Sequence, residues 1–256
     1  MRKSILVLLT SLSFVVGAWA GVTNCNVSPG TQSDGQPAIN DFVGAAATNF
    51  YFIRVLQGHS YSVEAVNNFT AFQGSDLVLG LLTGGCGATT QTFTDVTGID
   101  PSLLGSNGAR MSFVASSSTA LNVSVNNPNG SGIQYTINVT DTTLQNPRWS
   151  TFSSFITQYA FRNTTSSTIS ATLVVTTTLG GVVAPVTLAF TVPANSEVFK
   201  IVAASGGDAN VTANHAGFAT LSYVGPAGSI KADAYFINPS ATVIVPNPFE
   251  ARSFQH

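Results

Sequence analysis

The clearest pattern in the chain is a strict alternation of apolar and polar side chains on either side of a short polar turn. Leu121, Val123 and Val125 alternate with Asn and Ser, and the same pattern resumes at residues 133–139. A period of two is typical of a strand with one buried face. Residues 126–132, rich in Asn and Gly, favour a turn. We expect an antiparallel hairpin whose outer face carries only amides and hydroxyls.

Similar short alternating segments precede this pair of strands. Each is too short and too regular for an amphipathic helix of ordinary length, and together they predict a β-sandwich. The best helical fragment after the N-terminal region, residues 39–47, is short and ends in alanines. The predicted upstream strands are residues 50–56, 60–66, 76–82 and 109–115.

The alternation stops near residues 141–148, where Pro147 is incompatible with a central strand. We therefore predict one domain over residues 21–142, a linker over 143–150 and a second domain over 151–256. The second domain has about seven strands at the spacing of an immunoglobulin-like sandwich. Its predicted strands are residues 155–163, 169–178, 186–192, 197–202, 218–224, 230–237 and 242–245. The fold class is all-β, with two consecutive sandwiches.

The N-terminal residues have the pattern of a secretory signal peptide over residues 1–20. Arg2 and Lys3 precede an apolar run over residues 5–16, and Ala18 and Ala20 place small residues before a cut at Gly21. That run is shorter than the roughly 20 residues needed to span a bilayer. We expect a secreted protein, or one held at the cell surface without a transmembrane anchor, with no membrane insertion after cleavage.

Charge is scarce in this chain. It has 9 Lys and Arg, 11 Asp and Glu, and only 8% charged residues overall. Loss of Arg2 and Lys3 with the signal leaves seven basic residues and a net charge of −4. No basic stripe is available to neutralise a phosphate backbone, so we expect no nucleic-acid partner.

The two cysteines, Cys25 and Cys86, predict a disulfide. An even pair in an exported chain is most simply bonded. The alternative is a metal site, but two thiols without a nearby His fall short of the four ligands that zinc takes. We expect no metal site and no cofactor.

The first domain resembles the bacterial pre-peptidase C-terminal domain family over residues 25–140. The resemblance rests on an aromatic strand followed by Gly58 and a second strand within residues 49–66. It continues through 75–82, 108–115 and 131–139 in the family's order. It implies a jelly-roll-like sandwich with a non-catalytic role in secretion, surface attachment or polymer binding. Asp76 has no carboxylate nearby in sequence, so no calcium site is carried over. The second domain, over residues 150–254, resembles uncharacterised exported bacterial β-sandwich domains through residues 215–236.

Candidate catalytic groups are few and scattered. The histidines are His59, His215 and His256. Asp208, His215 and Ser222 are close in sequence, but no Gly-x-Ser-x-Gly motif surrounds the serine. Residues 84–87 lack the lysine of a phosphate-binding loop and predict a turn. We expect no catalytic residues and no enzyme activity. The carboxylates considered for glycoside cleavage, and predicted to be isolated, are Glu64, Asp76, Asp233 and Glu250.

Two functional hypotheses remain. The first is a binding or adhesion module that recognises a polysaccharide or a surface protein through hydroxyl and amide faces, with Tyr51, Tyr159 and Tyr235 as contacts. The second is a self-associating subunit of an extracellular assembly, joined by strand addition at poorly charged sheet edges, with residues 247–256 as a donor strand. A hydrolase with an unrecognised site is a third possibility. We favour the binding module.

Overall fold

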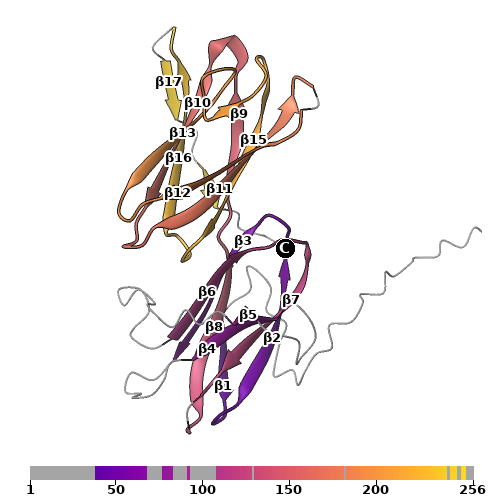
Figure 1. The fold of residues 1–256 in the computed structure, drawn as a ribbon, viewed down its shortest axis with the longest axis vertical. Helices are drawn as coiled ribbons and strands as arrows, with labels where there is room; N and C mark the ends of the chain where they lie inside the picture. The colour runs from indigo at the N-terminus through magenta and orange to yellow at the C-terminus, as the bar shows by residue number, and fades with distance from the viewer. Residues whose placement is uncertain are drawn as a thin grey trace, which may run out of the picture.

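Two antiparallel β-sandwiches are stacked end to end in the computed structural model (Figure 1). The structure describes residues 38–67, 77–82, 91–92, 108–128, 130–181, 183–240, 243–246 and 249–251. Within these residues no α-helix occurs, so the all-β, sandwich-type prediction is confirmed. The predicted signal peptide, both cysteines and the segment 84–87 lie outside the described residues.

The first sandwich contains eight strands in two four-stranded sheets, ordered β1-β8-β3-β6 and β2-β7-β4-β5. This is the strand order of a jelly roll. Residues 39–43, part of the considered helical fragment, form an edge strand instead. The strands are β1 (Ile39–Val43), β2 (Thr48–Val55), β3 (Ser60–Asn67), β4 (Val78–Leu82), β5 (Gln91–Thr92), β6 (Gly108–Val114), β7 (Thr119–Asn126) and β8 (Ile133–Asp141).

The prediction of a hairpin over residues 121–139 is wrong, because its two strands do not pair with each other. β7 and β8 lie in opposite sheets, and their connection crosses from one sheet to the other. Asn127 fixes this connection, because its Nδ2 donates to Gly44 O at 2.9 Å and to Ser131 O at 2.8 Å. The polar side of β7 is also covered, since Asn122 and Ser124 are buried. Alternation and turn residues do not distinguish a hairpin from a crossing between sheets.

The second sandwich has two five-stranded sheets, ordered β12-β11-β15-β9-β18 and β14-β13-β10-β16-β17. A short 3-10 turn, η1 (Phe152–Ser154), connects β9 to β10. The strands are β9 (Leu144–Ser150), β10 (Ile156–Asn163), β11 (Ile169–Leu179), β12 (Val186–Val192), β13 (Glu197–Ala203), β14 (Ala209–Asn210), β15 (Ala216–Val224), β16 (Ile230–Asn238), β17 (Val243–Pro246) and β18 (Glu250–Ala251).

The strand order of the second sandwich is not the immunoglobulin one. The first two strands of an immunoglobulin sandwich share a sheet, whereas β9 and β10 lie in opposite sheets. The order β12-β11-β15-β9 in one sheet corresponds to β5-β4-β7-β2 of the first sandwich. The order β13-β10-β16-β17 in the other sheet corresponds to β6-β3-β8-β1, with β17 in the place of β1. The second sandwich is therefore a jelly roll as well. Strand spacing in the sequence predicts a sandwich but carries no information on this order.

The linker expected at residues 143–150 is in fact strand β9. Pro147 is tolerated because the β9–β15 register shifts between Asn146 and Trp149, so Pro147 lies in a bulge. The only residues between β8 and β9 are Thr142 and Thr143. Such a short connection restricts how far the two sandwiches can separate.

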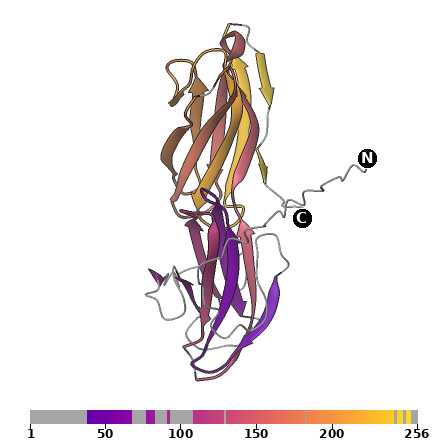
Figure 2. The same ribbon diagram turned by 90° about the vertical axis from the view of Figure 1, so that its right-hand side faces the viewer.

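Hydrogen bonds hold the two sandwiches together at this junction. Ser112 Oγ of β6 donates to Gly225 O at 2.9 Å, and Ser222 Oγ of β15 donates to Gly58 O. The views in Figures 1 and 2 show the resulting elongated molecule, with the second sandwich above the first. Each sandwich keeps its own apolar core.

Candidate functional site

Two of the three tyrosines expected to contact a polymer are core residues. Tyr51 is 1% exposed and Tyr159 is fully buried. Tyr51 lies on the same inward face of β2 as Ile53, and Tyr159 lies on the same inward face of β10 as Phe161. The alternation of apolar and polar residues in these strands therefore already indicates that both tyrosines are buried. Tyr235 is different, because it is half-buried on the outer face of β16, where its strand partners are Gln158 and Pro246.

Tyr51 belongs to a polar network that joins the two sheets of the first sandwich. Its hydroxyl donates to Asp41 Oδ2 at 2.6 Å and bonds the hydroxyl of Tyr135. Asn49 Nδ2 donates to Tyr135 at 2.9 Å. Burial raises the pKa of Tyr135 to about 12, although its hydrogen bonds with Tyr51 and Asn49 act in the opposite direction and lower the pKa. Burial, together with the bond to Asp41, raises the pKa of Tyr51 well above its usual range. This network is a structural cross-link.

The residues Asp208, His215 and Ser222 do not form a catalytic trio. Asp208 accepts hydrogen bonds from Ile201 N at 2.8 Å and Lys200 Nζ at 3.1 Å. Its slight burial would raise its pKa, but these bonds bring the pKa below its usual value. His215 Nδ1 donates to Ala213 O at 2.8 Å, and Ser222 lies at the domain junction. Each side chain has a separate structural partner.

The four candidate carboxylates are not brought together by the fold either. Glu64 on β3 accepts a hydrogen bond from Arg110 Nε on β6 at 2.9 Å, and both side chains are largely buried. Asp233 is exposed on β16 of the other sandwich. Asp76, the side chain of Glu250, and His256 lie outside the described residues. Of these four candidates, the two whose side chains the structure describes, Glu64 and Asp233, lie in different sandwiches.

An acid and imidazole pair that no local sequence pattern indicates lies at the domain junction. His59 Nδ1 lies 2.6 Å from Asp141 Oδ2, and Asp141 is 1% exposed. The neighbouring hydroxyls have partners of their own. Thr142 Oγ1 donates to Ser60 Oγ at 2.9 Å, and Thr143 Oγ1 accepts from Ser60 N at 2.9 Å. The arrangement ties the end of β8 to the start of β3, which is a positioning role.

A cleft of about 370 Å³ opens beside this pair, at the junction of the two sandwiches. Its walls combine apolar side chains, threonine hydroxyls and three charged side chains, Asp141, Lys231 and Asp233. Burial raises the pKa of Tyr223 at the cleft, although hydrogen bonds with Gly228, Ser229, Ile230 and Thr142 oppose that rise. The cleft is lined by Thr140, Asp141, Thr142, Thr143, Leu144, Tyr223, Ala227, Gly228, Ile230, Lys231, Ala232, Asp233 and Phe249.

The open side of the cleft exists because β17 is short. It pairs only with residues 235–238 of β16, so along residues 230–234 no described strand covers that side of β16. The chain then crosses to the other sheet, where Glu250 and Ala251 pair with β9. Phe249 lies between the two sheets. Its ring centroid is 5.2 Å from that of Tyr159 and 5.7 Å from that of Phe161. The cleft therefore offers backbone groups of a strand edge to a ligand.

Part of the tail predicted as a donor strand, residues 249–251, has partners within its own chain. β18 pairs with β9, and Phe249 packs against the core of the second sandwich. Residues 247–248 and 252–256 lie outside the described residues, and strand addition to another copy stays a prediction.

Comparisons with known proteins do not identify a family for this chain. No family model matches the sequence, and no curated protein matches it. The resemblance to the pre-peptidase C-terminal domain family therefore stays a prediction. Among the described residues, none of the helices is long and apolar enough for a membrane span. The same residues contain no cluster of three or more His, Cys, Asp or Glu that could hold a metal ion.

Proposed function

We propose that this chain is a secreted, non-catalytic module that binds an extracellular polysaccharide at the junction cleft. The cleft itself carries the proposal, because its size lies in the range of ligand sites, roughly 300–1,000 Å³. One or two sugar units of a longer polymer fit such a space. The cleft is open at its side, so a polymer chain can pass through it without a free end.

The chemistry of the walls suits a sugar. A sugar ring presents apolar C–H faces and a rim of hydroxyls, each of which donates and accepts hydrogen bonds. Leu144 and Phe249 offer apolar surface, Thr140 offers a hydroxyl, and the edge of β16 offers amide and carbonyl groups. Asp233 and Lys231 supply one acceptor and one donor at the rim. Asp141 also lines the cleft but is buried against His59. The two exposed charges, Asp233 and Lys231, are opposite, which favours a neutral ligand over an anion.

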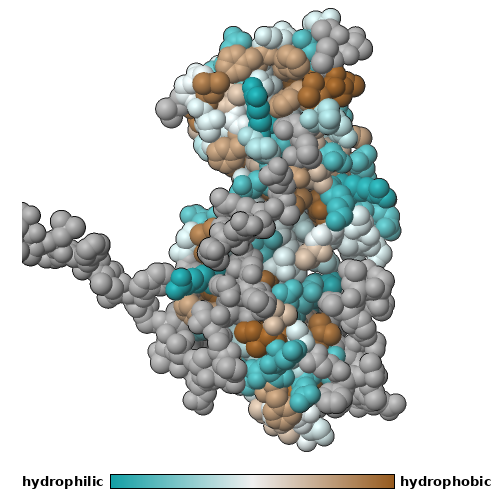
Figure 3. All heavy atoms as spheres, turned by 180° about the vertical axis from the view of Figure 1, so that it is seen from behind, coloured by the Kyte–Doolittle hydropathy of each residue, from teal (hydrophilic) through white to brown (hydrophobic). Residues whose placement is uncertain are grey.

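The outer face of β16 extends this site beyond the cleft. Asp233 and Tyr235 are two residues apart on one strand, so they share a face about 7 Å apart. Across the sheet, Ala160 separates Asp233 from Phe199, which is 51% exposed. In Figure 3 hydrophobic and hydrophilic atoms lie side by side over the upper domain. A polymer leaving the cleft at Asp233 meets the ring of Tyr235 next.

The hydrogen bonding of the hydroxyls near His59 supports binding over catalysis. The serine and threonine side chains around His59 have structural partners and are buried. A nucleophile must lie within reach of a base and also of the substrate. Ser60, the hydroxyl nearest to His59 in sequence, is fully buried.

Replacement of Asp233 by Ala tests the proposal. We expect retention on the polysaccharide that binds the wild-type chain to weaken about 10-fold, since a hydrogen bond to a charged acceptor is lost. Tyr235→Ala should weaken it by a similar factor. Affinity electrophoresis over a panel of cell-wall and matrix polysaccharides measures both variants. Because the ligand is neutral, added salt should change retention little.

Glu197→Ala is the matched control. Glu197 is exposed on β13, two strands from β16, and it does not line the cleft. Its loss changes the net charge equally. The control should bind like the wild type. A wild-type chain that no polysaccharide in the panel retains would overturn the proposal, as would a Glu197→Ala variant as weak as Asp233→Ala.

A further inference from the structure

The edge strand β12 differs from the other long edge strands of the molecule. Edge strands expose unpaired backbone groups, and proteins commonly protect them with charges, proline or bulges. Among the edge strands of five or more residues that the structure describes, β1 carries Asp41, β2 carries Arg54 and β6 carries Arg110. β12 has the sequence VTLAFTV, with no charge and no proline. Its register with β11 is continuous from Val186 to Val192, without a bulge.

The side chains of β12 leave apolar surface incompletely covered. Val186, Leu188 and Phe190 face the core of the second sandwich but are only partly buried. Thr187, Ala189 and Thr191 alternate with them and are exposed on the outer face. A strand added beside β12 would therefore bury three half-covered apolar side chains and satisfy a row of backbone groups.

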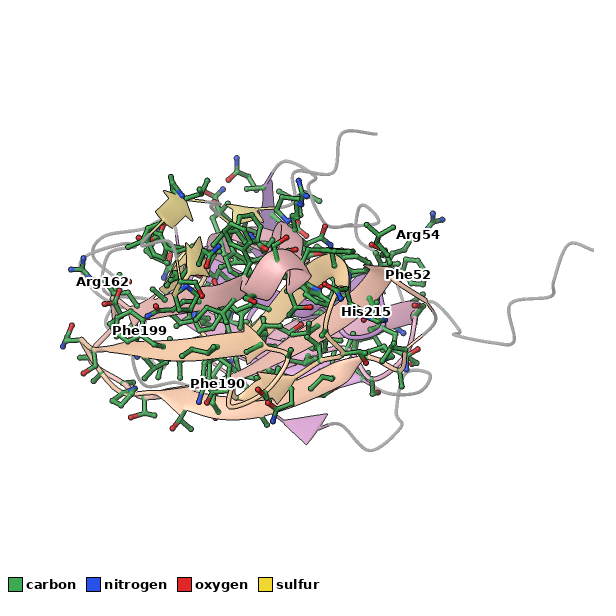
Figure 4. The ribbon with its side chains drawn as sticks, turned by 90° about the horizontal axis from the view of Figure 1, so that it is seen from above. Phe52, Arg54, Arg162, Phe190, Phe199 and His215 are labelled. Atoms are coloured by element: carbon green, nitrogen blue, oxygen red, sulfur yellow. The ribbon has the colours of Figure 1, made fainter. Side chains whose placement is uncertain are left out.

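A charge beside β12, that of Lys200, is neutralised within its own chain. Lys200 on β13 lies over the ring of Phe190, with Nζ 5.4 Å from the ring centroid, and it bonds Asp208 at 3.1 Å. Figure 4 places Phe190 and Phe199 on the same side of the molecule, opposite Phe52 and Arg54. The Lys200 charge is thus matched within its own chain, and the β12 edge itself stays neutral.

The sequence of β12 is nearly a palindrome centred on Ala189. In an antiparallel pairing of two copies about a twofold axis at Ala189, Val186 lies opposite Val192 of the second copy. Thr187 then lies opposite Thr191, and Leu188 lies opposite Phe190. Thr–Thr and aromatic–aliphatic pairs are favourable cross-strand neighbours. A twofold interface requires this kind of self-complementarity, because the same patch must match itself.

We infer that the occupant of the β12 edge is the β12 edge of a second copy of this chain. The two five-stranded sheets then join into one continuous sheet across the twofold axis. The pairing uses the same edge on both copies, so it closes as a dimer and leaves no further β12 edge for growth. This inference does not depend on what the junction cleft binds. If that cleft binds a polymer, the dimer presents two clefts and gains avidity.

The Ala189→Lys variant tests the inference. Ala189 is exposed in the monomer, so a lysine is tolerated there, but the twofold axis would place two lysines face to face. We expect the dissociation constant of the dimer to rise about 10-fold or more, because like charges directly opposite each other are repulsive. Sedimentation velocity of the full mature chain over a concentration series measures it. Ser240→Lys, in an exposed turn beyond β16, adds the same charge and should leave the dimer intact.

A mixture of Ala189→Lys and Ala189→Glu variants tests the register itself. Each variant alone should dimerise at least 10-fold more weakly than the wild type, whereas the mixture should form heterodimers, because the proposed pairing brings residue 189 beside its own copy. Circular dichroism of each monomer checks that it is folded. The inference is overturned if the wild-type chain stays monomeric at its highest soluble concentration. It is also overturned if the two variants dimerise as the wild type does, or if their mixture fails to associate.

Discussion

The protein should lose stability steeply above pH 10. Four tyrosines are buried, namely Tyr51, Tyr135, Tyr159 and Tyr223. Burial raises the pKa of each above the ordinary tyrosine value of 10.0, and it raises the pKa of Tyr135 to about 12. In the unfolded chain these hydroxyls ionise near pH 10, while in the folded chain they keep their protons. Their contribution to stability is fully present below pH 10 and is lost as the pH rises through the folded pKa.

The expected size of this effect follows from the number of tyrosines. Each contributes about 1.4 kcal/mol per pH unit, so four give a slope approaching about 5 kcal/mol per pH unit above pH 10. Urea unfolding at a series of pH values measures it. Tyr51→Phe should remove about a quarter of the slope. A free energy of unfolding that stays constant up to pH 12 would contradict this explanation.

Replacement of Gly217 by Ala should be among the most destabilising single changes. A Cβ at Gly217 would lie 1.8 Å from Thr176 O and 2.8 Å from Thr176 C. Both are backbone atoms of the neighbouring strand β11, so no side-chain rotation can relieve the overlap. Trp149 Nε1 donates to the same carbonyl, Thr176 O, at 3.0 Å and to Phe218 O at 3.1 Å. Moving β11 away would break these bonds and the β11–β15 ladder.

We expect Gly217→Ala to lower the free energy of unfolding by about 4 kcal/mol, in the range of severe packing defects. Trp149 is the only tryptophan after Gly21, so its fluorescence during urea unfolding reports on the second sandwich. Gly130→Ala is the matched control, because a Cβ there meets nothing within 4 Å. The explanation fails if Gly217→Ala unfolds at the same urea concentration as Gly130→Ala.

The strands were predictable because the period of two follows directly from burial of one face. Residues 186–192 and 230–237 were predicted almost as the structure has them, since turn residues bound them on both sides. Pairing was not predictable in the same way. β7 and β8 alternate like a hairpin yet lie in opposite sheets, because both place apolar side chains toward one core from its two sides.

Pro147 misled the sequence analysis for a related reason. A proline is excluded from a regular ladder but not from a bulge, and the bulge in β9 depends on its partner β15. Local sequence therefore indicated a linker where the fold contains a strand. The domain boundary lies only a few residues earlier, at Thr142 and Thr143.

The candidate site was less predictable than the fold. Tyr51 and Tyr159 are each two residues from a core residue, Ile53 and Phe161, so the period of two in the sequence already placed them on the buried face of their strands. The His59–Asp141 pair spans 82 residues in sequence and depends on the register of β3 with β8. The cleft depends on where β17 stops and on how the two sandwiches meet. Neither property leaves a local pattern in the chain.

The most direct test of polymer binding at the junction is chemical-shift mapping of the isotope-labelled mature chain. The titrant is a soluble oligosaccharide cut from whichever polysaccharide retains the protein. We predict that the amide signals of residues 140–144 and 230–235 move, with those of Phe249 beside them. Shifts confined to the polar outer face of the β1-β8-β3-β6 sheet, with the junction unperturbed, would contradict the assignment of the cleft as the binding site.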